Sequence, residues 1–136
     1  MRAMQIAATV RSSPLGHATE VATAGATRPI AIAAKGDGRG SAVNGGELLM
    51  LALATCYCND LYREATRLGI PIEGVEVEAE ATFPGVGLAA TDVRYRARVE
   101  SSAPAADIER LLRETDAVAE IHNTLRRGVD VLRQDA

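Results

Sequence analysis

The feature that most constrains this chain is one long segment, residues 45–68, with helix signals at both of its ends. Asn44 and Glu47 have the spacing of a capping box, in which each side chain accepts from the other residue's backbone N–H. Gly69 provides the left-handed residue that ends many helices, and Pro71 prevents continuation. The segment therefore predicts a helix about 35 Å long, at ~1.5 Å per residue.

The first half of this predicted helix, residues 48–58, carries apolar or small side chains on every side. A helix that is apolar all round is buried all round, so we expect this half to lie between sheets or against a partner helix. The later half, residues 59–67, is amphipathic. The chain is 47% hydrophobic but only 3% aromatic, and a core of small aliphatic side chains gives each element little apolar area to bury. Pairing with a second copy would add to that area, so the composition is a first indication of a dimer.

The residues before this helix predict an antiparallel meander of three short strands. The expected strands are residues 4–10, 17–23 and 29–34, with a turn at residues 12–16. The segment 36–41 holds three glycines near Arg39, but their spacing matches neither the Walker nor the dinucleotide pattern. We expect a mobile loop there.

The residues after the helix predict a hairpin, two helices and a closing strand. Residues 72–83 and 90–100 alternate between apolar and polar side chains. Three glutamates of the first strand and three arginines of the second can pair across the wet face of this hairpin: Glu76, Glu78, Glu80, Arg94, Arg96 and Arg98. The helices are expected at 104–117 and 119–127, and the strand at 129–132. The fold class is α+β, in the order β-β-β-α-β-β-α-α-β, as a single domain of residues 1–136.

The charge and hydropathy patterns narrow the range of functions. The net charge of -3 and the pI of about 5.4 do not favour binding to nucleic acid. Residues 1–11 lack an apolar stretch long enough for a signal peptide, and no window reaches the ~18 apolar residues of a membrane span. We therefore expect a cytoplasmic protein with neither nucleic acid nor membrane as a partner. Its two cysteines, Cys56 and Cys58, would start as free thiols there.

Residues 46–56, with the sequence GELLMLALATC, resemble the signature of the OsmC/Ohr family. In that family a helix opens with Pro-x-Glu-Leu-Leu and reaches Ala-x-Cys two or three turns later. The element order is similar, and so is the exit through residues 68–77 into a charged alternating strand. The resemblance implies an OsmC-like fold, in an intertwined homodimer with sheets wrapped around two central helices and the active site at the interface. It also implies that a reactive cysteine reduces organic hydroperoxides, helped by a basic residue and a carboxylate and resolved by a second cysteine.

Cys56 stands at the position of the reactive cysteine, and the sequence departs from the family pattern around it. Ala119 stands where the second thiol is expected, and Gly45-Gly46 replaces the proline before the Glu-Leu-Leu motif. An external thiol would then have to complete turnover. The family's basic residue precedes the helix, which here gives Lys35 as the nearest in spacing, with Arg28 and Arg39 as alternatives.

Peroxide reduction needs a thiolate with a cation beside it. Cys56 lies three turns into its helix, where the helix dipole gives little help, and Asp60 at i+4 opposes ionisation. Glu47 lies on the opposite side of the helix and more than ~10 Å away along its axis, so it needs a folded-back loop or a partner subunit to act on a Cys56. Cys58 projects about 200° away from Cys56, which makes it a core residue rather than a resolving thiol.

The leading hypothesis is a thiol-dependent peroxidase-like protein that reduces organic hydroperoxides through Cys56, with an external thiol as reductant. Its candidate catalytic residues are Cys56, Lys35, Arg28, Arg39 and Glu47. The alternative is a non-catalytic dimer that binds a small hydrophobic ligand or senses oxidation. We expect neither a metal nor a cofactor, because no spacing of His17, His122 and Cys56 supports a metal site, and solvated or capping histidines are expected.

Overall fold

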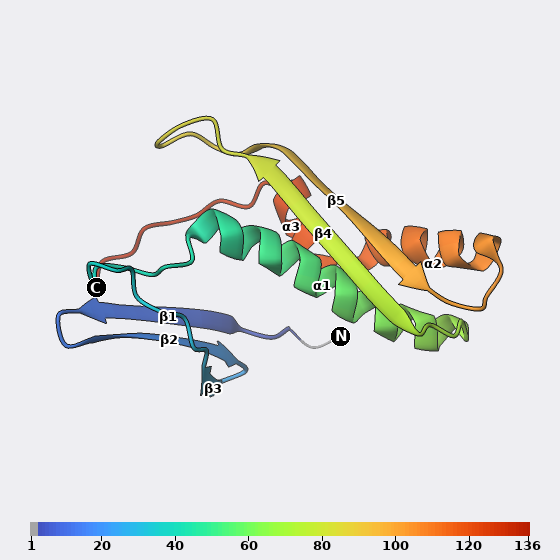
Figure 1. Ribbon diagram of the computed structural model, residues 1–136, viewed down its shortest axis with the longest axis horizontal. Coiled ribbons are helices and arrows are strands. Elements are labelled where there is room, and N and C mark those ends of the chain that lie inside the picture. The colour runs from blue at the N-terminus through green and yellow to red at the C-terminus, as the bar shows by residue number, and fades with distance from the viewer. Residues whose placement is uncertain (1–2) are drawn as a thin grey trace. The chain divides into compact units, whose positions relative to one another are not determined.

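The computed structural model describes residues 3–136 (Figure 1). The chain divides after Glu47 into two compact units, and each is described by itself. The expectation of a single domain stays a prediction.

The first unit is the predicted antiparallel meander, with β1 (Ile6–Ser13), β2 (Gly16–Thr23) and β3 (Ala26–Pro29) in that order. The expected turn at residues 12–16 is too wide, because β1 continues to Ser13 and pairs there with Gly16. The expected third strand at 29–34 is wrong. Ala24 and Gly25 both have positive φ and close a two-residue hairpin turn, so β3 starts at once and ends at Pro29, which has no N–H for the ladder.

The long helix α1 (Gly45–Leu68) has the predicted bounds. Its capping box is formed as expected: the Asn44 N–H donates to Glu47 Oε1 at 2.9 Å, and the Glu47 N–H donates to Asn44 Oδ1 at 2.8 Å. Gly69 has φ +68°, the left-handed conformation that ends the helix. Among residues 3–136 no helix is both long and apolar enough to cross a membrane.

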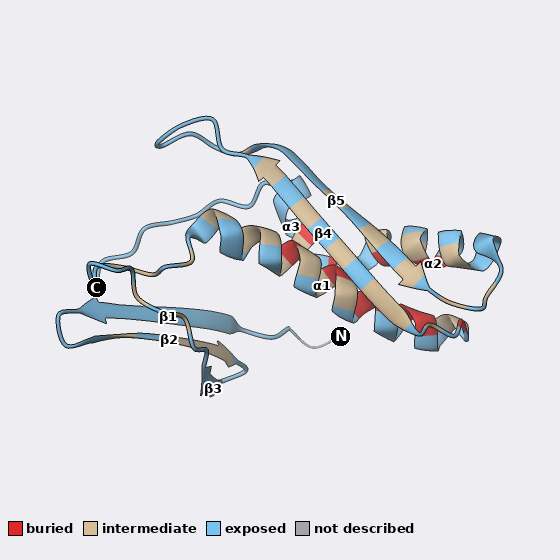
Figure 2. Cartoon of the chain, viewed as in Figure 1, coloured by how far each residue is buried: buried red, intermediate tan, exposed pale blue. Residues whose placement is uncertain are grey.

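The second unit packs a hairpin and two helices against α1. Strands β4 (Gly74–Thr82) and β5 (Thr91–Glu100) pair antiparallel, and α2 (Ala105–Val118) and α3 (Glu120–Arg127) follow. The core joins the buried stripe of α1 to the inner face of the hairpin and to α2 (Figure 2). Its fully buried members include Tyr57, Leu61 and Leu111.

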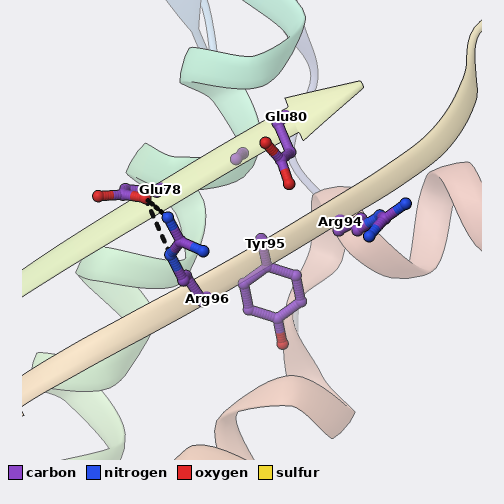
Figure 3. Close-up of a pocket in the computed structure, with 6 residues that line it drawn as sticks. Glu78, Glu80, Arg94, Tyr95 and Arg96 are labelled. Carbon is purple, nitrogen blue, oxygen red and sulfur yellow. Dashed lines mark hydrogen bonds and ion pairs between the residues drawn. The ribbon is translucent and has the colours of Figure 1, made fainter. Parts of the chain in front are cut away.

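The outer face of the hairpin carries the predicted charge ladder. Glu76 lies opposite Arg98, Glu78 opposite Arg96 and Glu80 opposite Arg94. Glu78 and Arg96 form an ion pair, drawn with dashed lines in Figure 3, whereas Tyr95 of β5 points to the other side, toward the helices. A hollow of about 400 Å³ lies among these side chains. The alternation thus separates a charged surface from the core, as predicted.

Two expectations for this unit are corrected. Residues 129–132 form no strand, and Val131 and Leu132 are 97% and 81% exposed; a segment without a partner strand has no ladder to join. The first half of α1 is not buried all round within one chain. Leu53 and Tyr57 are buried against the hairpin, but Leu48 and Leu51 are 38% and 59% exposed. One hairpin covers only one face of a helix.

Candidate thiol site

Cys56 lies in the middle of α1, half-buried, with two carboxylates beside its sulfur. Its Sγ is 3.6 Å from Oδ2 of Asp60, one turn later on α1. It is also 3.6 Å from Oε2 of Glu120, the first residue of α3. The thiol can donate its proton to either oxygen. The three atoms lie within 4.8 Å of one another.

Glu120 is the functional neighbour that the sequence did not reveal. The preceding residue, Ala119, stands where the family's second cysteine is expected, and it is fully buried at 0% exposure. Its burial fixes the start of α3 against the core, and this places the next side chain at the sulfur of Cys56. The available signal was the position of Glu120 directly after the missing cysteine. A carboxylate therefore reaches the thiol from the segment in which a second sulfur was expected.

Both carboxylates beside the thiol are paired with Arg63. The Arg63 guanidinium lies 2.9 Å from Oδ1 of Asp60 and 3.8 Å from Oε1 of Glu120. It also lies 3.5 Å from Oε2 of Glu64. The spacing of Cys56, Asp60 and Glu120 would suit a divalent cation, but Arg63 already supplies positive charge to both carboxylates. We interpret the group as a thiol beside a carboxyl pair and not as a metal centre.

The surroundings of Cys56 keep its thiol protonated. Burial raises the pKa of Cys56, and the carboxylates of Asp60 and Glu120 raise it further, while the Ile121 backbone N–H opposes them. Burial and the neighbouring Glu120 also raise the pKa of Asp60. The pKa of Glu120 is lowered by its own backbone N–H at the start of α3, with Asp60 and Arg63 adding to the effect. The two carboxyls therefore differ in how readily they hold a proton.

The other residues expected at the site lie in the first unit. Arg28 is on β3, and Lys35 and Arg39 belong to the turn closed by the bridge between Ala34 and Ser41. Glu47 performs the capping role at Asn44 that its spacing predicted. The roles of these four residues beside a Cys56 sulfur stay predictions. Cys58 is half-buried and free, like Cys56, and lies outside the hydrophobic core of this unit, so the expectation of a core residue is wrong within one chain.

A second feature of this unit is an aromatic cluster around His122. The expectation of a solvated or capping histidine is wrong here: His122 is 3% exposed, with its ring centroid 4.4 Å from that of Tyr95 and 5.6 Å from that of Tyr57. Neither ring nitrogen has a hydrogen-bond partner within the described residues. Burial, followed by the charge of Arg126, lowers the pKa of His122. A cavity of about 250 Å³ adjoins the ring, with Leu53, Val93, Tyr95 and Leu125 among its lining residues.

The phenols of this cluster are anchored by hydrogen bonds. The Tyr57 hydroxyl donates to the Leu112 carbonyl oxygen at 2.7 Å, and the Tyr95 hydroxyl donates to the Asp116 carboxylate. Burial raises the pKa of Tyr57 to about 12. These bonds tie α1 and β5 to α2, which holds the helix that carries Cys56.

The family model for OsmC-like proteins matches residues 37–132 of the 136-residue chain. The chain belongs to the OsmC-like family. No protein of the curated set matches this OsmC-like chain. Three solved structures with a similar fold are distant in sequence. An OsmC-like protein from Mycoplasma pneumoniae has 16% identity, with 94% of this chain and 89% of that chain covered and a TM-score of 0.65.

Two further structures agree with this OsmC-like fold. An organic hydroperoxide resistance protein OsmC from Legionella pneumophila, also described as a predicted redox protein, has 18% identity, with 93% of this chain and 92% of that chain covered and a TM-score of 0.59. An OsmC-like hydroperoxide resistance protein from a Jannaschia species has 14% identity, with coverages of 98% and 93% and a TM-score of 0.56. The expected OsmC-like α+β fold is confirmed, without its closing strand.

Proposed function

We propose that this OsmC-like protein is a thiol-dependent peroxidase-like protein that reduces organic hydroperoxides through Cys56. The observation that carries the proposal is the half-buried Cys56 thiol, at the family's reactive position, with hydrogen-bonding side chains at its sulfur in place of aliphatic carbon. The Legionella and Jannaschia structures, described as hydroperoxide resistance proteins, support the same theme. Lys35, Arg28 or Arg39 is the proposed cation that favours the thiolate.

The reductant in this proposal is an external thiol. The sulfur chemistry needs a second thiol to reduce the sulfenic acid formed on Cys56. Cys58 projects about 200° away on the same helix, so a disulfide between the two would require the helix to unwind. Ala119 offers no sulfur. A reducing cytoplasm, where we propose that the protein works, holds small thiols in supply.

A peroxide-consumption assay with excess dithiothreitol tests the function. We expect the wild-type protein to consume cumene hydroperoxide. We also expect dimedone to trap a sulfenic acid on Cys56. Cys56→Ser should abolish both signals. Cys58→Ser is the matched control, the same substitution two residues away, and should retain them. A wild-type protein without peroxide loss under excess dithiol, or a Cys56→Ser variant as active as wild type, contradicts the proposal.

We also propose that the protein works as a homodimer with α1 at the contact. The less buried face of α1 carries a stripe at alternating spacings of three and four: Leu48, Leu51, Thr55, Cys58 and Tyr62. That spacing is the a/d pattern by which two helices pack together. Three of these side chains, Leu48, Leu51 and Tyr62, are 38%, 59% and 46% exposed within one chain. A second copy would cover them.

The second candidate function is a dimer that binds a small hydrophobic ligand or senses oxidation. The cavity of about 250 Å³ beside His122, with Leu53, Val93 and Leu125 in its lining, favours it. The same assay separates the two functions. Stoichiometric oxidation of Cys56 without turnover under excess dithiol favours sensing, and steady peroxide loss favours the peroxidase.

A further inference from the structure

We infer that Glu120 and Asp60 are an acid–base pair for the reaction at Cys56. The Glu120 carboxylate takes the thiol proton, and the Asp60 carboxyl group gives a proton to the departing alkoxide. The inference rests on the proposed peroxidase function and adds two catalytic residues to it, neither of which comes from the segment before α1.

The geometry that carries the inference is the contact of two different carboxyl groups with one sulfur. Glu120 Oε2 and Asp60 Oδ2 each lie 3.6 Å from Sγ of Cys56. The Asp60 side chain is only 6% exposed and is held by Arg63 at 2.9 Å, whereas the Glu120 side chain is 53% exposed. One carboxyl group therefore faces the interior and the other faces solvent, and both are within reach of the reacting atom.

The charges around the pair separate the roles. Burial and Glu120 raise the pKa of Asp60, and the backbone N–H at the start of α3 lowers the pKa of Glu120. Arg63 and, behind it, Glu64 face the pair from α1, and the Ile121 N–H faces the sulfur from α3. Two titratable groups whose environments push their pKa values apart can serve as base and acid in one reaction. Glu120 stays ionised more readily and is free to accept a proton, whereas Asp60 holds a proton more readily and can supply one.

The reaction balances when it starts with Glu120 ionised and Asp60 protonated on Oδ2, the oxygen beside the sulfur, while Oδ1 accepts from Arg63. The Cys56 S–H bond breaks and its proton moves to Glu120. The sulfur then attacks the terminal oxygen of the hydroperoxide: the S–O bond forms, the O–O bond breaks, and the alkoxide takes the proton of Asp60. The products are a sulfenic acid and an alcohol, so sulfur is oxidised by two electrons and the peroxide is reduced. Transfer of the proton from Glu120 to Asp60, whose oxygens lie within 4.8 Å of each other, restores the pair.

Two reactions of Cys56 test the pair, because they differ in whether they need an acid and a base beside the sulfur. Iodoacetamide reacts with the thiolate and needs no acid, whereas a hydroperoxide needs both groups. In Glu120→Gln a negative charge beside the thiol is lost, so we expect faster alkylation at pH 7. Because the base is lost as well, we expect a reaction with cumene hydroperoxide that is at least roughly 100-fold slower. The matched control is Glu109→Gln, on an exposed position of α2, which should change neither rate.

A peroxy acid separates the two roles. Its leaving group is a carboxylate, which needs no proton, so Asp60→Asn should react with peracetic acid at the wild-type rate but slowly with cumene hydroperoxide. Glu120→Gln should be slow with both oxidants. If alkylation and peroxide reaction rise together in Glu120→Gln, the carboxylates merely hold the thiol protonated and the inference is overturned. Glu120 is at the surface, so this result stands even if Asp60→Asn fails to fold. A wild-type protein that consumes no hydroperoxide overturns the proposed function itself, and the inference with it.

Discussion

The sulfur of Cys56 lies 3.6 Å from Oε2 of Glu120, although the two residues are 64 positions apart in the sequence. This contact gives the thiol an anionic neighbour, which can accept its proton but which opposes the thiolate that a cation would stabilise. The second unit therefore raises the pKa of Cys56, and a group that favours the thiolate must outweigh this effect.

The titration of Cys56 is the first prediction. Burial and the two carboxylates raise its pKa, so the thiolate forms above the ordinary pH range of a free cysteine. We expect the rate of alkylation by iodoacetamide to rise with pH, and the pH at its midpoint to lie above that of an unfolded control peptide. Mass spectrometry on the Cys58→Ser variant, in which Cys56 is the one cysteine, measures this rate. A midpoint below that of the peptide would contradict this prediction and show that the cation proposed from Lys35, Arg28 or Arg39 outweighs the two carboxylates.

Arg63 is predicted to matter for both reactivity and stability. Arg63→Gln removes the charge shared by Asp60 and Glu120, so the thiol should alkylate more slowly at pH 7. Asp60 is 4% exposed, and loss of its cation should lower the free energy of unfolding by about 1–2 kcal/mol, discounted because Arg63 itself is half-exposed. Urea denaturation measures this loss. Arg113→Gln on an exposed position of α2 is the control and should stay within about 0.5 kcal/mol of wild type; an equal loss in both variants contradicts the assignment.

The elements with local signals could be predicted from the sequence. The capping box at Asn44 and Glu47, with Gly69 at the other end, fixed the bounds of α1, because these signals act within one turn of the chain. The alternation of the hairpin likewise predicted which residues face the core. The strand predicted at residues 129–132 is absent, since a strand needs a partner and a short segment does not supply one by itself.

The thiol site could be predicted only in part. Cys56 was identified through the family pattern, and Asp60 through its helical spacing. Glu120 and Arg63 were not, because their place depends on how α3 packs beside α1, which is a tertiary contact without a local signal. His122 was missed for the same reason: its burial comes from Tyr57 on α1 and Tyr95 on β5, two elements far from it in the sequence.

The pH dependence of stability is predicted to follow His122. Burial lowers the pKa of folded His122 below the ordinary value near ~6.5. The unfolded chain therefore binds its proton at a higher pH than the folded chain. The neutral ring contributes stability that is fully present above the unfolded pKa and is lost as the pH falls through the folded pKa.

His122→Phe tests this dependence, because phenylalanine keeps an aromatic ring between Tyr57 and Tyr95 but cannot be protonated. We expect the free energy of unfolding to fall less between pH 7.5 and 5 in this variant than in wild type, measured by urea denaturation at each pH. Equal slopes in wild type and His122→Phe would assign the pH dependence to other groups.

The assembly of two chains through α1 is the last prediction. Leu51 is a 59% exposed member of the α1 stripe, and a glutamate there would be buried against its own copy in a dimer. We expect wild type to have twice the chain mass of 14.3 kDa by light scattering, and Leu51→Glu to dissociate at least roughly 100-fold more readily, since an unpaired buried charge costs several kcal/mol. Leu15→Glu, at a 99% exposed turn position, makes the same change away from the stripe and should remain dimeric. A monomeric wild-type protein would show that no dimer contact exists. A dimeric Leu51→Glu variant would place the dimer contact elsewhere on the chain.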